Sequence, residues 1–161
     1  MDHLGIETFD VVGFCIGGPL IWNPLRRAGD RVNAAVLVHP SGYRPEMPDL
    51  FYQNNIKGWA PKFLESRPDV NQADVEAYLH NMYTNRADYV FTVDRDFVAN
   101  CQTPILILPD DVPAHPFAPA MESALLAPNA QVSLYPWRQP DAHIPLAVRH
   151  VRTFLKAAQQ Y

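Results

Sequence analysis

The sequence has few cysteines and no long apolar run, and both absences narrow the classes of protein that it can encode. Cys15 and Cys101 are the only cysteines in 161 residues, too few for a disulfide framework. No apolar run approaches the roughly 20 residues that a membrane-spanning helix needs. The opening Met-Asp-His-Leu-Gly lacks the charged and apolar regions of a signal peptide. We therefore predict a cytoplasmic protein that does not enter a membrane.

Basic clusters and cofactor motifs are also missing. The formal net charge is −4 and the basic residues do not cluster, which argues against nucleic acid and anionic membranes as partners. The histidines show no His-Glu-x-x-His spacing, and the two cysteines are not closely paired. No glycine-rich phosphate loop with G-x-G-x-x-G spacing occurs. We predict no metal site and no cofactor.

Alternating apolar runs and helical patterns predict an α/β fold. At 48% hydrophobic and 19% charged residues, the chain is long and apolar enough to form one globular domain with a buried core. Four apolar runs predict strands, at residues 9–14, 34–39, 104–108 and 131–135. Helices are predicted over residues 19–28, 117–126 and 144–159. Strands that alternate with helices form a mostly parallel sheet flanked by helices.

A long insertion separates the second and third predicted strands. It covers residues 41–100, is rich in aromatic residues and contains a predicted capped helix over residues 69–83. An unstructured loop of this length is improbable, so we predict a helical cap over the sheet. The predicted division is a core of residues 1–40 and 101–161 with a cap of residues 41–100. The aromatic residues either line an apolar acyl or aromatic pocket or form the ordinary core of this helical layer.

Of all parts of the sequence, the stretch from Phe9 to Trp22 contains the pattern that most directly indicates a chemical function. A short apolar strand leads into a turn with Cys15 at its apex, and a helix follows. Gly13 and Gly17 stand two positions on either side of Cys15, giving the pattern G-x-C-x-G. A nucleophile elbow needs small residues at such positions, because its strained backbone packs closely against the strand and the helix. The pattern predicts a reactive cysteine at a sharp turn between strand and helix.

The order of these elements resembles the C-terminal part of an α/β-hydrolase, over nearly the whole chain. The Gly-Phe-Cys-Ile-Gly-Gly stretch is similar to the elbow of dienelactone hydrolases, which use cysteine where most of the family uses serine. The family's sheet has eight strands, of which four precede the elbow strand. The resemblance therefore implies that the N-terminal strands are missing, so that the chain is truncated or partial, or is completed by another polypeptide.

The resemblance also implies a catalytic triad and an oxyanion hole. The nucleophile falls on Cys15, the acid on Asp111 with Asp110 as the alternative, and the base on His143. The backbone N–H of Ile16 becomes an oxyanion donor. Each residue has a structural interpretation as well. Cys15 can be a small buried apolar residue, the two aspartates can cap the following helix, and His143 can be a polar residue that initiates a helix.

Three further residues carry weaker predictions. His39 ends a predicted strand at the edge where the site is expected and can line a pocket. His115 is either a loop histidine that packs on proline or a substitute for the catalytic histidine. Cys101 is predicted to be structural.

Two functions of different classes follow. The first is a hydrolase that acts on an ester, thioester or lactone through the triad of Cys15, His143 and Asp111, with a small carbonyl compound as substrate. The alternative is a non-catalytic remnant or subunit whose exposed sheet edge pairs with another chain, as a homodimer or with a separate N-terminal half. The sequence does not identify the substrate, because fold does not fix function.

Overall fold

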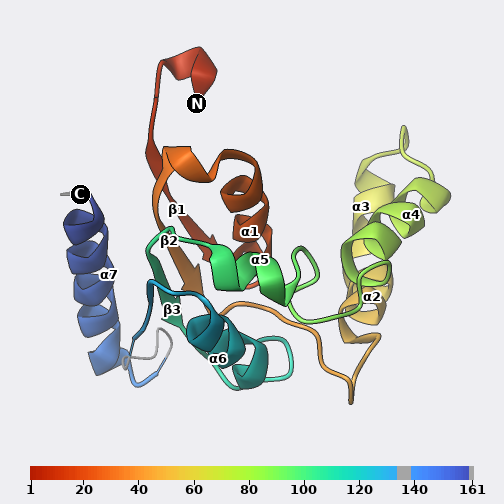
Figure 1. Ribbon diagram of the computed structural model, residues 1–161. Coiled ribbons are helices and arrows are strands. Elements are labelled where there is room, and N and C mark those ends of the chain that lie inside the picture. The colour runs from red at the N-terminus through yellow and green to blue at the C-terminus, as the bar shows by residue number, and fades with distance from the viewer. Residues whose placement is uncertain (134–138, 160–161) are drawn as a thin grey trace.

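A four-stranded parallel sheet forms the centre of the molecule. The computed structural model describes residues 1–133 and 139–159 (Figure 1). Along the sheet the strands lie in chain order and pair in parallel. They are β1 (Phe9–Phe14), β2 (Val32–Val38), β3 (Ile105–Leu108) and β4 (Ala130–Val132). The predicted α/β class is therefore confirmed, and the carboxyl ends of the strands meet at one edge of the sheet.

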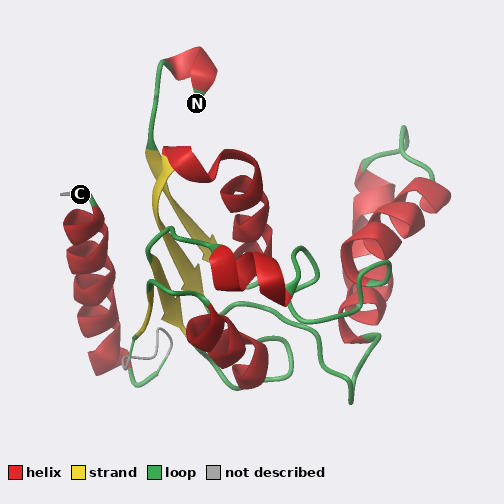
Figure 2. Ribbon diagram, viewed as in Figure 1, coloured by secondary structure: helices red, strands yellow, loops and turns green. Residues whose placement is uncertain are grey.

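Helices cover both faces of this sheet. Figure 2 shows α7 on one side and α1, α5 and α6 on the other. The helices of the two layers are α1 (Gly17–Ala28), α5 (Arg95–Asn100), α6 (Phe117–Leu126) and α7 (Ile144–Ala158). Short 3-10 turns are η1 (Asp2–Leu4), η2 (Gly29–Arg31) and η4 (Asp141–His143). No helix in the described ranges is long and apolar enough to cross a membrane.

The two central strands are buried on both faces, which explains their continuous apolar sequences. Successive side chains of a strand point to opposite faces. In β3, Ile105 and Ile107 pack in the core cluster beneath α1 and α6. Leu106 and Leu108 pack on the opposite face against Ala147 and Phe154 of α7. The sheet thus separates two apolar layers.

A separate helical group lies beside the sheet layers (Figure 1). It contains α2 (Leu50–Asn54), the π-helical turn η3 (Asn55–Trp59), α3 (Ala60–Ser66) and α4 (Gln72–Tyr83). The segment after this group packs differently, because Tyr89, Val90, Val93 and Val98 belong to the core cluster of the sheet. The division into core and cap stays a prediction, and this packing favours a boundary before Tyr89.

Most predicted elements lie close to their observed positions. The helix at residues 117–126 has the predicted bounds, and β1 matches residues 9–14. The helix predicted over residues 69–83 begins instead at Gln72, because Asn71 caps it: the Asn71 side-chain oxygen accepts the Asp74 N–H at 2.9 Å. Asp69 lies outside the helix and pairs with Arg67. Residues 134 and 135 of the strand predicted at 131–135 fall outside the described residues.

The cap at Asn71 can be tested against its neighbour. Asn71→Ala should lower the free energy of unfolding by about 1 kcal/mol, because an N-terminal amide of α4 loses its acceptor. Asp69→Ala removes only an exposed ion pair and should leave stability nearly unchanged. Urea denaturation of the two variants measures both effects. Equal destabilisation by the two substitutions would contradict the assignment of the cap.

Candidate active site

Cys15 occupies a strained turn between β1 and α1. Its φ is 53°, in the left-handed region that side chains other than glycine rarely adopt. Two backbone hydrogen bonds attach it to the end of β2 and to the segment that follows: its N–H donates to Val38 O and its carbonyl accepts the Ser41 N–H, both at 3.0 Å. The same carbonyl accepts the Gly18 N–H at 3.0 Å. This is the geometry of a nucleophile elbow, with Cys15 half-buried at the carboxyl edge of the sheet.

Glycine is required on both sides of the turn, but not at both predicted positions. A Cβ at Gly13 would lie 2.3 Å from the Gly17 carbonyl oxygen, and one at Gly18 would lie 2.6 Å from the Pro40 Cβ. A Cβ at Gly17 would meet nothing within 4 Å. The close approaches at the elbow therefore involve Gly13 and Gly18. The prediction that Gly17 must be small for steric reasons is wrong, because its own Cα faces open space.

The residue that contacts the Cys15 thiol is one that the sequence analysis did not single out. Ser41 Oγ lies 3.4 Å from Cys15 Sγ, and Ser41 is 1% exposed. It comes three residues after the end of β2, at the sheet edge where Cys15 also lies. The available signal in the sequence was the run His39-Pro40-Ser41, which follows a buried apolar strand.

The structure distinguishes the two candidate acids. Asp110 follows β3 and is half-buried; its Oδ2 lies 3.1 Å from His115 Nδ1 and 3.8 Å from His39 Nδ1. Its other oxygen accepts the Asp111 N–H at 2.9 Å. Asp111 is exposed and lies on a surface hollow with Tyr43. Of the two, Asp110 is the carboxylate that the fold brings to imidazole groups.

Asp110 is held in its ionised form. Desolvation is the largest single influence and raises the pKa of this carboxyl group. The hydrogen bonds from His115 and from the Asp111 N–H, with the charges of His39 and His115, oppose it and leave the pKa below its ordinary value. Asp110 is therefore a carboxylate that accepts hydrogen bonds at neutral pH.

His143 lies at the junction of η4 and α7. It is half-buried, and its N–H donates to Pro140 O at 2.8 Å. Its position after β4 and before the last helix is the one that the sequence predicted. Ile16 follows Cys15 and caps α1 with a helical backbone, so its N–H belongs to the first residues of the elbow helix. The catalytic roles of these two residues stay predictions.

Aromatic residues of the helical group pack near the elbow together with Phe91, from the segment that follows the group. Phe51 stacks on Tyr83 with ring centroids 5.4 Å apart, and Phe91 meets both edge-on. Ile16, next to Cys15, packs against this cluster. Burial, with smaller contributions from Tyr78 and Cys15, raises the pKa of Tyr83 to about 12. The cluster is thus a packed apolar wall with a neutral phenol beside the elbow.

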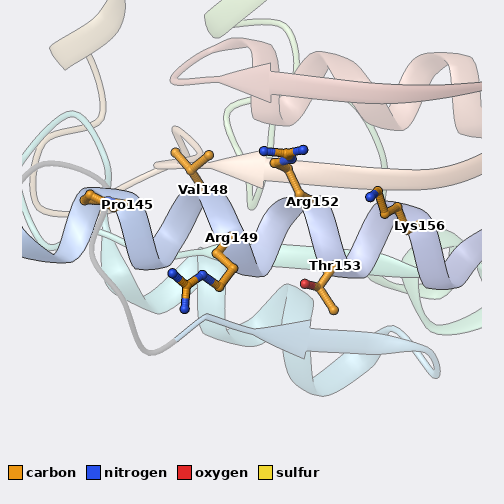
Figure 3. Close-up of a pocket in the computed structure, with 6 residues that line it drawn as sticks. All are labelled: Pro145, Val148, Arg149, Arg152, Thr153 and Lys156. Carbon is orange, nitrogen blue, oxygen red and sulfur yellow. The ribbon is translucent and has the colours of Figure 1, made fainter.

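A hollow along α7 contains none of the predicted site residues. It is lined by Pro145, Val148, Arg149, Arg152, Thr153 and Lys156. Figure 3 shows Arg152 and Arg149 projecting on different sides of the helix, so their charges do not converge on one point. This basic surface of exposed side chains is distinct from the elbow.

The chain belongs to the alpha/beta hydrolase fold family. The model of that family matches residues 1–141. The strained elbow at Cys15, the parallel sheet and the helices on its two faces agree with this assignment. Among proteins of curated function, no sequence matches this chain.

Solved structures share the fold at low sequence identity. A meta-cleavage product hydrolase (CumD) from Pseudomonas fluorescens IP01 is 20% identical with a TM-score of 0.62, covering 98% of this chain and 68% of that one. A serine hydrolase from Cycloclasticus zankles is 19% identical with a TM-score of 0.62, covering 98% and 67%. The esterase RhEst1 from Rhodococcus sp. ECU1013 is 16% identical with a TM-score of 0.60, covering 98% and 68%. Identities this low show the fold alone.

The close approach at Gly18 gives a test of the elbow geometry. Gly18→Ala should lower the free energy of unfolding by about 1–3 kcal/mol, because the new methyl group overlaps Pro40. Gly17→Ala should be neutral or slightly stabilising, because it adds a methyl group in open space at the start of α1. Urea denaturation compares the two. A Gly17→Ala variant as unstable as Gly18→Ala would show that the turn is packed differently.

Proposed function

We propose that this protein hydrolyses a small ester, thioester or lactone, with Cys15 as the nucleophile. The observation that carries the proposal is the backbone of Cys15, which has a φ of 53° between β1 and α1 and is hydrogen-bonded to Val38 at the end of β2 and to Ser41 beyond it. Strain of this kind persists where the surrounding structure enforces it, and it is concentrated at functional sites. It presents a half-exposed thiol at the edge of the sheet.

The proposed reaction has two steps. The Cys15 sulfur attacks the carbonyl carbon while His143 accepts the thiol proton, and the Ile16 N–H donates to the oxyanion. The bond between the carbonyl carbon and the leaving group then breaks, while the new C–S bond remains. The leaving alcohol or thiol takes the proton from His143, and an acyl-cysteine is left on the enzyme. Water, deprotonated by His143, then attacks the acyl group. The C–S bond breaks, the carboxylic acid is released, and the proton on His143 returns to the Cys15 sulfur. The start of a helix favours negative charge at the sulfur and the oxyanion.

The orienting acid is one of the two adjacent aspartates. The sequence favoured Asp111, but Asp110 is half-buried just after β3, and its carboxylate already lies next to the imidazoles of His115 and His39. The exposed position of Asp111 makes it less suited to this task, because solvent weakens its interaction with an imidazolium. We therefore propose Asp110 as the acid.

The aromatic wall beside Ile16 supports a substrate with an apolar acyl part. Tyr83, Phe51 and Phe91 pack on one another, and Ile16 next to Cys15 packs against the same cluster. Apolar and aromatic linings with few polar groups are typical of small-molecule sites.

Substitution of the nucleophile tests the mechanism. Cys15→Ala should reduce hydrolysis of short-chain p-nitrophenyl esters and of a simple lactone by roughly 10³-fold or more, whereas Cys15→Ser should retain part of the activity. His143→Ala should reduce kcat by about 10²–10⁴-fold and slow alkylation of Cys15 by iodoacetamide. Cys101→Ala, which removes a thiol buried in the core cluster, is the control that keeps the activity. Hydrolysis unaffected by Cys15→Ala would refute the mechanism.

The two aspartates give a matched pair for the acid. Asp110→Asn should lower kcat by a larger factor than Asp111→Asn, because only Asp110 lies among the imidazoles. Steady-state kinetics on the same ester measures both variants. A larger loss in Asp111→Asn would return the acid to the position that the sequence favoured.

The second candidate function is association with another chain through β1. This strand lies at one end of the sheet order, and Val12 and Phe14 on it are 47% and 49% exposed. Apolar side chains on an edge strand favour pairing with a further strand. A homodimer or a separate partner chain could be accommodated there, and this function does not need Cys15.

Light scattering coupled to gel filtration tests the association. If β1 mediates pairing, the protein is dimeric and Val12→Lys shifts it toward the monomer by at least about tenfold in dissociation constant, since a charge at the edge opposes strand pairing. Leu125→Lys on α6, where the side chain is 83% exposed, is the control that leaves the dimer intact. A wild-type protein that stays monomeric at high concentration excludes self-association through β1.

A further inference from the structure

Three side chains with metal-binding atoms meet at the carboxyl edge of the sheet, although they are far apart in the sequence. Asp110 Oδ2 lies 3.1 Å from His115 Nδ1 and 3.8 Å from His39 Nδ1. One potential ligand atom from each of the three residues falls within 4.8 Å of the other two. We propose that His39, Asp110 and His115 form a binding site for a divalent first-row transition ion, with Zn²⁺ as the ion that it takes.

Regular structure holds the first two ligands in place. His39 directly follows β2, is 6% exposed and has a φ of 46°, and its N–H donates to Leu108 O at the end of β3 at 2.9 Å. The Asp111 N–H binds Asp110 Oδ1 at 2.9 Å and thereby leaves Oδ2 directed at the imidazoles. Backbone hydrogen bonds therefore hold both ligands, His39 against the end of β3 and Asp110 through the Asp111 N–H, which is what a preorganised metal site requires.

A tight turn brings the third ligand back to the first two. Val112 and His115 form an isolated antiparallel bridge, in which each N–H donates to the carbonyl of the other at 3.3 and 2.9 Å. This reversal of the chain returns the His115 ring to the Asp110 carboxylate. The His115 and His39 rings lie 5.6 Å apart at an angle of 50°, so they approach from different directions.

The donor set and its spacing suit zinc. Imidazole nitrogen and carboxylate oxygen bind Zn²⁺ at about 2.0–2.2 Å, so donor atoms on a tetrahedral ion lie roughly 3.3–3.5 Å apart. The two separations from Asp110 Oδ2, 3.1 and 3.8 Å, fall on either side of that range. Two histidines and one carboxylate leave a coordination position for water or another ligand, as in zinc and iron sites that bind substrates.

Local spacing in the sequence does not reveal this site. Asp110 and His115 are near one another in the chain, but His39 comes from the end of a different strand. Only the parallel pairing of β2 with β3 brings it to the same edge. The proposal therefore differs from the prediction of no metal site, and the titration below decides between them.

Titration of the chelator-treated protein with Zn²⁺ tests the site by calorimetry. We expect one ion per chain with a micromolar or lower dissociation constant. Asp110→Asn and His115→Ala should each weaken binding by at least about 10–100-fold, because each removes one of three protein ligands. Circular dichroism verifies that the variants fold; if His115→Ala does not, Asp110→Asn, which preserves the side-chain shape, decides the test.

Two control variants separate this site from other metal-binding groups. His150→Ala removes a half-buried histidine whose Nδ1 lies 3.1 Å from Ser133 Oγ, and it should bind Zn²⁺ like the wild type. Cys15→Ser should do the same, and Co²⁺ bound to the wild type should show no thiolate charge-transfer band. A folded wild type without saturable binding, undiminished binding by Asp110→Asn, or loss of binding in Cys15→Ser would each overturn the proposal. Because the readout is metal binding, it is independent of ester hydrolysis.

Discussion

Two backbone hydrogen bonds of Cys15 determine the arrangement of the candidate active site. Its N–H binds Val38 O and its carbonyl binds the Ser41 N–H, so β1–β2 pairing continues beyond the last residue of β1. The turn cannot relax to an ordinary backbone conformation without breaking both bonds. These bonds therefore place the thiol, the first turn of α1 and the Ser41 hydroxyl relative to one another, before any side-chain contact is considered.

A backbone hydrogen bond also links the ends of β2 and β3, close to Asp110. The His39 N–H binds Leu108 O, which joins the ends of β2 and β3 as Cys15 joins those of β1 and β2. Asp110 thus lies where both proposals meet, as the acid of a thiol hydrolase and as a ligand of a metal ion. One carboxylate oxygen cannot fully serve both roles at once, so an ion at this position would oppose the hydrolysis that depends on the same carboxylate.

The sequence predicted the elements well and the site only in part. Apolar runs and helical spacing located the strands and most helices, because burial on both faces of a sheet leaves a continuous apolar run. The elbow was visible because glycines and cysteine occur within a few residues. In contrast, Ser41 and the approach of His39 to Asp110 depend on strand pairing between distant segments, which local patterns do not encode. The choice between Asp110 and Asp111 likewise depends on side-chain direction after β3.

The two cysteines of this chain differ in backbone conformation and in exposure. Cys101 has the features of an inert, structural thiol. It is 8% exposed, lies in the core cluster and has an ordinary φ of −73°. Cys15 is half-exposed and has a positive φ, a conformation that costs about 1–3 kcal/mol. Tyr89 and Phe91 also have positive φ although they are buried in the apolar clusters, so the backbone conformation alone does not separate chemistry from packing. What distinguishes Cys15 is the combination of this turn with half-exposure at the sheet edge, which leaves the thiol accessible as the proposed hydrolysis requires.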